Sequence, residues 1–396
     1  MTETVSTKAP DRTDDDAIVS VNDLEVSFKT PLGVVHALNG VSFDVPRGKV
    51  LGIVGESGGG KSVTGRAIMQ ILEAAGQITS GSIEFQRGEQ VQSSQLMADS
   101  ETAAETKEAT TRSGAIDIAQ LDPRGSAMRS IRGAEIAMIF QEPMTSLNPV
   151  YTIGAQIEEA ILLHQTQDKR QAREQAVDML RQVGMPNPER IAKSYPHELS
   201  GGMRQRAMIA MALSCHPSLL IADEPTTALD VTTEAQILAV MRKLKDEIGM
   251  SIMFITHSMG VVAQMCDEVI VIYLGRVVER APVDEIFYAP KHPYTRALLR
   301  SIPRIGAAEG TKLEVIKGTI PDPYSEVSGC TFHPRCPDFM PGLCDTVIPV
   351  ETVLAGPTRH GVRCHLYTEE GRQKQAETGT ETGTADTAPE TTTTEA

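Results

Sequence analysis

The chain has 396 residues, a formal net charge of −15 at pH 7, 40% hydrophobic residues, 4% aromatic residues and no tryptophan. Its length is enough for two domains, or for one large domain with additions. The acidic balance argues against a surface for nucleic acid. The few aromatic residues argue against a stacking platform for single strands.

Most of the negative charge lies in three low-complexity segments. Residues 1–16, 87–115 and 368–396 account for −10 of the net charge. These segments lack the apolar residues whose burial would offset the entropy lost on ordering. We therefore predict a disordered N-terminus over 1–17, a disordered surface loop over 87–115 and a disordered acidic tail over 368–396.

No segment of the sequence is suited to crossing a membrane. The longest apolar runs, such as VIVIYL at 269–274, are far shorter than the roughly 20 residues of a spanning helix. Residues 1–16 have neither the basic region nor the apolar region of a secretory signal. We expect a chain without a membrane span, in a reducing compartment where its six cysteines form no structural disulfides.

The first part of the chain has the pattern of strands. Residues 18–28 and 41–45 alternate between apolar and polar in the manner of antiparallel strands. The apolar run KVLGIVG at 49–55 is typical of a buried strand, and a helix is predicted over 61–74. Two further strands are predicted at 81–86 and 134–140.

The second part predicts a parallel sheet followed by an appended block. From about residue 153 to residue 215 the pattern is helical. Strands and helices then alternate, which is typical of a parallel sheet with crossovers. Residues 291–367 are rich in proline and cysteine and have little periodicity, so we predict a small C-terminal domain there. The alternating elements are strand 218–225, helix 231–248, strand 251–256, helix 258–266 and strand 268–274.

A glycine-rich motif follows the buried strand. GESGGGKS at 55–62 fits the pattern G-x-x-x-x-G-K-[ST], in which backbone N–H groups and a helix N-terminus surround phosphate oxygens. Lys61 is placed to reach the β- and γ-phosphates and Ser62 to ligate Mg²⁺. The alternative is a tight strand-to-helix turn with an exposed lysine. The predicted nucleotide-binding residues of this loop are Gly55, Glu56, Ser57, Gly58, Gly59, Gly60, Lys61, Ser62 and Val63.

Acidic residues that match this loop follow a second buried strand. LLIADEP at 219–225 has four apolar residues before Asp223, which places Asp223 at the carboxyl end of a strand, where ligands bind in such sheets. Asp223 is then placed to hold Mg²⁺ through water, and Glu224 to orient or deprotonate an attacking water. The alternative role for these residues is a helix N-cap.

Two polar residues follow other predicted strands. His257 closes the strand at 251–256 and Gln141 follows the strand at 134–140. Taken alone, His257 fits an ordinary surface or core histidine and Gln141 fits a polar strand cap. Taken with the other motifs, both are predicted to contact the γ-phosphate as catalytic residues, and Gln141 is predicted as a further Mg²⁺ ligand.

These motifs form an ordered set. GESGGGKS, Gln141, LSGGMRQR at 199–206, LLIADEP, ALD at 228–230 and TH at 256–257 together resemble the nucleotide-binding subunit of an ATP-binding cassette (ABC) transporter. The resemblance covers roughly residues 18–290 and implies hydrolysis of ATP with Mg²⁺. It implies an α/β fold, a P-loop ABC-type nucleotide-binding domain with a RecA-like parallel-sheet core, an antiparallel β subdomain and an α-helical subdomain over 142–215.

The resemblance also gives a role to a second glycine pair. In this family Ser200, Gly201 and Gly202 would face the γ-phosphate of ATP bound on a second subunit, so that two subunits enclose two ATP molecules. A helix N-terminus at this position offers N–H donors for that contact. The alternative is Ser200 as an ordinary helix N-cap.

Two more residues are assigned through the same resemblance. Asp230 in ALD would lie at the interface between the two subunits. Phe28 at the end of the first strand would stack on adenine, although it fits ordinary core packing as well. One residue departs from the family pattern, because Ser258 follows His257 where the family usually has aspartate.

Three segments resemble the peptide and nickel importer branch of the family, at 138–157, 198–213 and 292–299. The resemblance implies a subunit that powers import of di- and oligopeptides, with nickel or another small solute as the alternative cargo. Its implied partners are a second ABC ATPase subunit in a heterodimer or homodimer, two transmembrane permease subunits and an extracytoplasmic peptide-binding protein. This would place the chain at the cytoplasmic face of the cell membrane.

The C-terminal block over 291–367 contains four cysteines. Their spacing, C-x5-C-x7-C-x19-C, lacks the close pairs usual in structural zinc sites, and a proline follows the second cysteine. These features favour a [4Fe–4S] cluster, with zinc and free thiols as alternatives. Some dipeptide and oligopeptide importer ATPases have a similar pattern and bind such a cluster. The cysteines are Cys330, Cys336, Cys344 and Cys364, whereas Cys215 and Cys266 are predicted to be buried without a role.

Two other classes of function are weighed against this prediction. A soluble ABC ATPase acting on ribosomes or nucleic acid would have two cassettes or a long coiled-coil insert, and basic surfaces. This chain has one set of motifs, no heptads and an acidic balance. A regulatory nucleotide-binding module without turnover is opposed by the presence of both Glu224 and His257.

Overall fold

The computed structural model describes most of the chain, with gaps. The N-terminal disorder predicted over 1–17 lies outside the described residues except at Ala17, which begins a strand. Parts of the predicted loop at 87–115 and of the predicted tail at 368–396 also lie outside them. Within the described part, no helix is long and apolar enough to cross a bilayer. The described residues are 17–87, 100–111, 114–141, 146–227, 229–302, 316–325 and 327–381.

An antiparallel sheet is built from the first strands of the chain. Its strand order is β2-β1-β4-β5. Strand β1 pairs with β2 and with β4, and the alternation at 18–28 and 41–45 is part of this pairing. The strands are β1 (Ala17–Thr30), β2 (Gly33–Pro46), β4 (Gly76–Phe85) and β5 (Ile116–Asp117).

A larger mixed sheet of eight strands has the order β11-β12-β10-β9-β3-β8-β7-β6. Its five strands from β9 to β6 are parallel, and the remaining three join antiparallel. The parallel strands are β3 (Val50–Val54), β6 (Ile136–Ile139), β7 (Leu219–Asp223), β8 (Ser251–Ile255) and β9 (Glu268–Tyr273), and the antiparallel ones are β10 (Arg276–Pro282), β11 (Thr352–Leu354) and β12 (His360–Val362).

The central strand β3 shows how the two sheets share a core. Every residue of β3 is buried, as the apolar run KVLGIVG predicts. Because side chains alternate along a strand, Leu51 and Ile53 pack towards the antiparallel sheet, while Val50 and Val54 pack towards the helices on the other face. The phosphate-binding loop therefore leaves the centre of a two-sided core.

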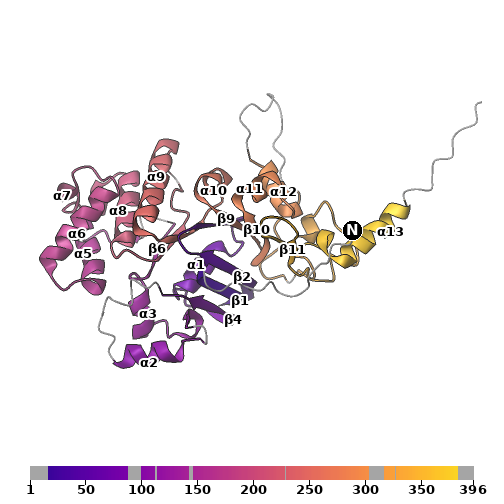
Figure 1. The fold of residues 1–396 in the computed structure, drawn as a ribbon, viewed down its shortest axis with the longest axis horizontal. Coiled ribbons are helices and arrows are strands. Elements are labelled where there is room, and N and C mark those ends of the chain that lie inside the picture. The colour runs from indigo at the N-terminus through magenta and orange to yellow at the C-terminus, as the bar shows by residue number, and fades with distance from the viewer. Residues whose placement is uncertain are drawn as a thin grey trace, which may run out of the picture.

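Helices cover the face of the large sheet opposite the antiparallel sheet. In Figure 1, α5, α6 and α7 lie at one end of the long axis, and the C-terminal elements lie at the other. The predicted helical segment 142–215 contains α5 (Ile153–His164), α6 (Lys169–Gln182), α7 (Pro188–Ile191) and α8 (Gly201–Leu213). The later helices are α9 (Val231–Ile248), α10 (Met259–Met265), α11 (Val283–Tyr288), α12 (Pro293–Arg300) and α13 (Glu369–Glu381).

The helix after the glycine loop is shorter than predicted. Helix α1 (Lys61–Ile68) ends well before residue 74. Gln70 has a φ of 52°, in the left-handed region, and its side chain donates to the carbonyl oxygen of Ile118 at 2.6 Å. A tertiary contact therefore fixes a backbone conformation that ends the helix, which the periodicity of the sequence does not reveal.

The prediction of a disordered loop over 87–115 is wrong for residues 100–111. These residues include helix α2 (Ser100–Glu108), which precedes α3 (Ser126–Ile131). The Glu105 carboxylate accepts hydrogen bonds from the Ala127 N–H at 2.9 Å and the Ser126 hydroxyl at 3.3 Å. The carboxylate of this polar helix thus binds one free N–H group and one hydroxyl at the start of its neighbour, and these contacts anchor the helix.

The prediction of a disordered tail from residue 368 is wrong for residues 369–381, which form α13. The buried Thr368 hydroxyl accepts a hydrogen bond from the Gly371 N–H at 3.2 Å, in the manner of a helix cap. A Cβ at Gly371 would lie 1.6 Å from the carbonyl oxygen of His365, so glycine permits this close approach. The residues beyond 381 lie outside the described part.

A separate small cysteine-rich domain over 291–367 is not supported. Strand β12 pairs with β10 and with β11, so this region extends the large sheet. Cys330, Phe332 and Cys344 are buried in the same apolar core as helices α5 to α10. The region shares the sheet and core of the cassette because it lacks enough apolar residues for a core of its own.

Candidate nucleotide-binding site

The glycine loop joins β3 to α1 and depends on glycine at specific positions. Gly55 has a φ of 152°, and a Cβ there would lie 2.1 Å from the carbonyl oxygen of Ile272. Gly60 precedes α1 with a φ of 96°, and its Cβ would lie 2.6 Å from the carbonyl oxygen of Ala37. Side chains are thereby excluded, and the backbone N–H groups are left to face a ligand.

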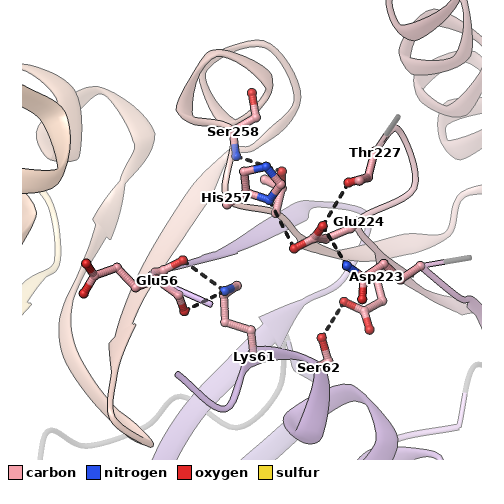
Figure 2. A network of polar contacts seen from close by, with 11 residues as sticks. Glu56, Lys61, Ser62, Asp223, Glu224, Thr227, His257 and Ser258 are labelled. Atoms are coloured by element: carbon pink, nitrogen blue, oxygen red, sulfur yellow. Dashed lines mark hydrogen bonds and ion pairs between the residues drawn. The ribbon is translucent and has the colours of Figure 1, made fainter. Parts of the chain in front are cut away.

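Lys61 is the first residue of α1 and is almost completely buried. Its Nζ donates to the carbonyl oxygens of Gly55 at 2.9 Å and Glu56 at 3.0 Å (Figure 2). Burial lowers the pKa of Lys61, and the neighbouring carboxylates oppose this shift. The lysine is thus held within the loop, where a bound phosphate would replace its two carbonyl partners.

Ser62 and Asp223 lie side by side at the carboxyl edge of the parallel strands. The Ser62 hydroxyl donates to Asp223 Oδ1 at 2.9 Å. Burial raises the pKa of Asp223, and the hydrogen bond from Ser62 opposes this shift. A hydroxyl and a carboxylate beside a phosphate loop are a suitable donor set for Mg²⁺, which takes few protein ligands together with phosphate oxygens.

Glu224 lies at the centre of a polar network. Its Oε1 is 3.1 Å from His257 Nδ1, and its Oε2 accepts from Gln141 Nε2 at 3.1 Å. Thr227, which the sequence analysis did not single out, donates to the same Oε2 at 2.9 Å (Figure 2). The sequence feature that could have identified Thr227 is its position in the run DEPTT, three residues after Glu224.

The backbone of Glu224 holds the carboxylate in place. Its φ is 47°, which is uncommon for a residue other than glycine, and its N–H donates to the carbonyl oxygen of Ile255 at 2.9 Å. Desolvation acts to raise the pKa of Glu224, but the hydrogen bonds from His257 and Thr227 outweigh it, so the pKa is lowered. An ionised carboxylate at this place can accept a proton from water.

The predicted Mg²⁺ set is only partly brought together. Ser62 and Asp223 are hydrogen-bonded to each other, whereas the hydrogen bond that the structure gives Gln141 goes to Glu224. Gln141 is exposed at the end of β6. Ser62 and Asp223 therefore fit a magnesium ion, and Gln141 is grouped with the Glu224 carboxylate.

The signature segment lies apart from the glycine loop, at the start of α8. Ser200 is exposed and caps α8, accepting a hydrogen bond from the Met203 N–H at 3.4 Å. Gly201 is also exposed, while a Cβ at Gly202 would lie 2.7 Å from Thr233 Cγ2. Gly202 thus permits the start of α8 to approach the start of α9, and Ser200 and Gly201 are left open to a ligand.

Asp230 is the N-cap of α9 and is exposed. Its carboxylate accepts from the Thr233 N–H at 2.9 Å and from the Thr233 hydroxyl at 2.7 Å. The hydrogen bond from the Thr233 N–H lowers the pKa of Asp230. The side chain has a local capping role, and the interface role predicted for it stays a prediction.

Phe28 lies in β1 two residues before the turn to β2, and it is partly buried. A Cβ at Gly76 of β4 would lie 2.7 Å from Phe28 Cε1, so the ring packs closely on that glycine. One face of the ring is thus supported by β4. The adenine contact predicted for Phe28 stays a prediction.

Glu56 has partners that the sequence did not indicate. Its N–H donates to Tyr294 Oη at 2.7 Å, and its carboxylate pairs with Arg335. Figure 2 shows this carboxylate pointing away from Lys61. Tyr294 and Arg335 come from the segments HPYTRALL and HPRCP, whose charged and aromatic residues gave no indication of this contact.

The four C-terminal cysteines do not form a recognisable metal centre. They lie close enough for Cys364 to interact electrostatically with Cys330, Cys336 and Cys344. Burial raises the pKa of both Cys336 and Cys364 to about 12. Among the described residues, no group of three or more His, Cys, Asp or Glu side chains is arranged to hold a metal ion. The residues as placed do not fit the predicted [4Fe–4S] cluster.

A phosphate loop, an acidic strand end and a separate signature helix on a parallel sheet define a P-loop ATPase of the ABC class. A model of the ABC transporter family matches residues 38–227. The ABC cassette MJ0796, solved as a dimer, is 24% identical, with a TM-score of 0.54 over 67% of this chain and 98% of that chain. This structural likeness shows the fold, an ABC cassette with mixed α/β sheets.

The full-length relatives define the family more closely. The putative peptide import ATP-binding protein BMEII0863 of Brucella melitensis is 47% identical over 89% of this chain and 98% of its own length. The oligopeptide transport ATP-binding protein AppD of Bacillus subtilis is 45% identical over 90% of this chain and 99% of its own. Residues 278–344 match the oligopeptide/dipeptide transporter C-terminal region. The chain belongs to the ABC transporter ATP-binding proteins of the oligopeptide/dipeptide family.

Proposed function

We propose that this chain is the ATP-hydrolysing subunit of an ABC importer and powers the uptake of di- and oligopeptides through a membrane permease. The observation that carries the proposal is the place of Glu224, held between His257 and Gln141 at 3.1 Å from each and ionised. A positioned carboxylate of this kind supplies general base catalysis. Relatives named as peptide importers support the cargo.

Each residue of the site has a chemical role in this proposal. Lys61 and the N–H groups of the glycine loop neutralise the phosphates. Ser62 and Asp223 would hold a magnesium ion, which would offset the charge on the phosphate oxygens. Glu224 accepts the proton of the attacking water, and His257 fixes the carboxylate. Gln141 links Glu224 to the exposed end of β6, which leads into the helical segment.

A second ABC ATPase subunit is the proposed partner at the signature segment. The exposed Ser200 and Gly201 at the N-terminus of α8 offer N–H groups to a γ-phosphate held by that subunit, and Asp230 lies on the exposed start of α9. We propose a heterodimer, with a homodimer as the alternative. Two permease subunits and an extracytoplasmic peptide-binding protein complete the assembly, and the chain lies at the cytoplasmic face of the membrane.

A Ser200→Ala variant tests the partner role separately from the capping role. The cap is long and exposed, so its loss should lower the free energy of unfolding by about 1 kcal/mol or less. Hydrolysis by the assembled pair should fall at least about tenfold, because the Ser200 hydroxyl, a donor to the γ-phosphate beside the N–H groups that alanine keeps, is lost. Unchanged hydrolysis in the assembled pair would mean that Ser200 is only a helix cap.

Copurification tests the transport role. The tagged chain is extracted gently from native membranes, its partners are identified by mass spectrometry, and ATP hydrolysis is measured with the binding protein and with short peptides or Ni²⁺. Two permeases, a second cassette and stimulation by peptides are the expected result. Stimulation by Ni²⁺ alone would favour the nickel alternative. Ribosomes or DNA, without membrane subunits, would contradict the transport role.

The contents of the four-cysteine region are tested separately. We keep a [4Fe–4S] cluster as a proposal, with zinc and free thiols as alternatives. The four cysteines lie near one another, which supports a shared ligand. Among the described residues, however, they are not arranged to hold a metal ion. Anaerobically purified protein is analysed for iron, sulfide and zinc, beside a Cys336→Ser variant. Iron and sulfide that are lost in the variant would support the cluster. A parent protein without iron would exclude it.

A further inference from the structure

A buried arginine from the C-terminal region reaches the glycine loop. Arg335 ends the short 3₁₀ helix at His333–Arg335, between two of the four cysteines. Its Nη1 is 2.7 Å from Glu56 Oε2 and its Nη2 is 3.1 Å from Glu56 Oε1. The Arg335 side chain is 4% exposed and that of Glu56 is 24% exposed. The pair is bidentate and mostly removed from water, and it joins residues 279 positions apart.

Other contacts fix the guanidinium before any ligand is present. Arg335 Nε donates to the carbonyl oxygen of Lys317 at 3.2 Å, and Nη1 also donates to Tyr273 Oη at 3.3 Å. The guanidinium carbon lies 5.8 Å from the centre of the Tyr273 ring. Since Tyr273 is the last residue of β9, the arginine is anchored to the parallel sheet beside the loop that it contacts.

The backbone of Glu56 is held from the same side. Its N–H donates to Tyr294 Oη at 2.7 Å. Tyr294 is completely buried, with its ring centre 4.7 Å from that of Tyr273 and 5.4 Å from that of Phe332. Both the main chain and the side chain of this loop residue are therefore positioned by the C-terminal region.

The charge on Glu56 gives this contact a consequence for nucleotide binding. Glu56 belongs to the loop that holds phosphate, and its carbonyl oxygen accepts from Lys61 Nζ. Without Arg335, its carboxylate would be an unpaired negative charge beside the site of a triphosphate. It would repel the phosphates, and it would also compete with them for the Lys61 ammonium group.

A second contact joins the C-terminal region to the other side of the proposed nucleotide site. Tyr324 Oη lies 3.2 Å from Thr30 Oγ1 at the end of β1, and the Tyr324 ring lies 3.6 Å from the Cβ position of Gly33. Tyr324 belongs to the described segment 316–325, whose Lys317 carbonyl oxygen is bound by Arg335. The same segment thus connects the glycine loop with the strand that carries Phe28.

We propose that Arg335 is a positioning residue of the nucleotide site, which neutralises and orients Glu56 so that the C-terminal region sets the affinity of this chain for ATP. The inference rests on the proposed function only in that the glycine loop binds ATP. Arg335 acts through Glu56 and does not touch the nucleotide. The ATP affinity of an ABC cassette with this C-terminal region therefore depends on Arg335, which lies outside the nucleotide-binding motifs.

The test compares ATP dissociation constants of the full chain, measured with a fluorescent ATP analogue at fixed Mg²⁺ and salt. We expect Arg335→Gln to weaken binding about tenfold, within the usual range of coupling between sites, with kcat at saturating ATP unchanged within about twofold. Arg335→Lys keeps the charge but not the bidentate geometry and should weaken binding about threefold. This conservative variant also keeps the test open if Arg335→Gln does not fold.

The double variant Arg335→Gln/Glu56→Gln separates charge neutralisation from a merely structural role. It removes the unpaired carboxylate, so its dissociation constant should return to within about threefold of the wild-type value. The matched control is Arg296→Gln, which breaks the ion pair with Asp338 at 2.8 Å in the same region, away from the glycine loop. Its ATP affinity should equal that of the wild type.

Two results would overturn the inference. One is an unchanged dissociation constant in folded Arg335→Gln and Arg335→Lys. The other is a double variant that binds as weakly as Arg335→Gln, because a structural role of the arginine is not rescued by removing the carboxylate. A wild-type chain that binds no ATP would instead overturn the proposed function, so the two failures are distinguishable.

Discussion

The catalytic edge of the parallel sheet and the C-terminal region support the same loop in different ways. At the catalytic edge, Asp223 ends β7, Glu224 follows it and Ser62 lies at the start of α1, and the Ser62 hydroxyl contacts Asp223 directly. In the C-terminal region, Tyr294 and Arg335 reach the loop from outside and hold a single residue, Glu56. The catalytic residues thus lie together at the sheet edge, whereas the conformation of Glu56 in the glycine loop is fixed by residues of the C-terminal region.

The two regions also differ in how they are stabilised. The parallel strands β3, β7 and β8 are buried throughout, and their pairing fixes the position of the acidic residues at their ends. The C-terminal region has little regular structure, and it depends on an aromatic group formed by Tyr273, Tyr294 and Phe332. Substitutions in the first region should therefore change catalysis, and substitutions in the second should change stability and affinity.

The largest expected effect is on catalysis at the sheet edge. Glu224→Gln should lower kcat for ATP hydrolysis by about 10³-fold, since a general base is lost, while the affinity for ATP changes little. Phosphate release at saturating ATP measures the rate. The control is Glu234→Gln in the first turn of α9, which should leave the rate unchanged. A variant Glu224→Gln that hydrolyses ATP within tenfold of wild type would assign the base elsewhere.

The next effect concerns the core of the C-terminal region. Phe332 is 1% exposed, so Phe332→Ala should lower the free energy of unfolding by about 3–5 kcal/mol through lost burial and a cavity. Urea denaturation measures this change. Phe339→Ala, at a position that is 37% exposed, is the control and should cost less than about 1 kcal/mol. Equal effects would mean that the aromatic group does not anchor the region.

A pH dependence is expected from His292, the N-cap of α12. Complete burial lowers the pKa of His292 to about 4, with the charge of Glu279 opposing this shift and that of Arg296 adding to it. Its Nδ1 accepts a hydrogen bond from the Tyr294 N–H at 3.1 Å, which protonation of that nitrogen would remove. Between pH 6.5 and 4 the unfolded chain binds a proton here that the folded chain does not bind. The free energy of unfolding therefore decreases as the pH falls.

The size of this dependence is about 3 kcal/mol across the interval, from 1.36 kcal/mol for each pKa unit. Urea unfolding at a series of pH values measures it. His292→Asn keeps a capping acceptor but does not titrate, so its stability should vary less over the same interval. If the wild type and His292→Asn respond equally to pH, another group is responsible for the dependence.

The smallest expected effect is that of an exposed ion pair. Arg296 and Asp338 are about one third exposed and lie 2.8 Å apart, so Arg296→Gln should lower the free energy of unfolding by less than about 1 kcal/mol. Thermal unfolding in low and high salt measures this change. A larger loss would mean that this pair stabilises the C-terminal region internally, by joining α12 to the cysteine-containing segment.

The motif residues were predictable because their signals are local. GESGGGKS follows an apolar run and precedes a helix, and LLIADEP ends a buried strand, so both sites could be placed on a parallel sheet from the sequence. Helix 231–248 was predicted with the bounds that α9 has. Helices α2 and α13 were missed, because their composition is polar and their order depends on contacts of Glu105 and Thr368.

The sequence by itself determined the class of the protein, the carboxyl edge that bears the acidic residues and the glycines that the phosphate loop needs. These features follow from periodicity and steric demands within short segments. Only the tertiary structure decided that β11 and β12 extend the large sheet and that Arg335 binds Glu56. Both are contacts between distant segments, and their partners are selected by packing and charge in three dimensions, which no local pattern encodes.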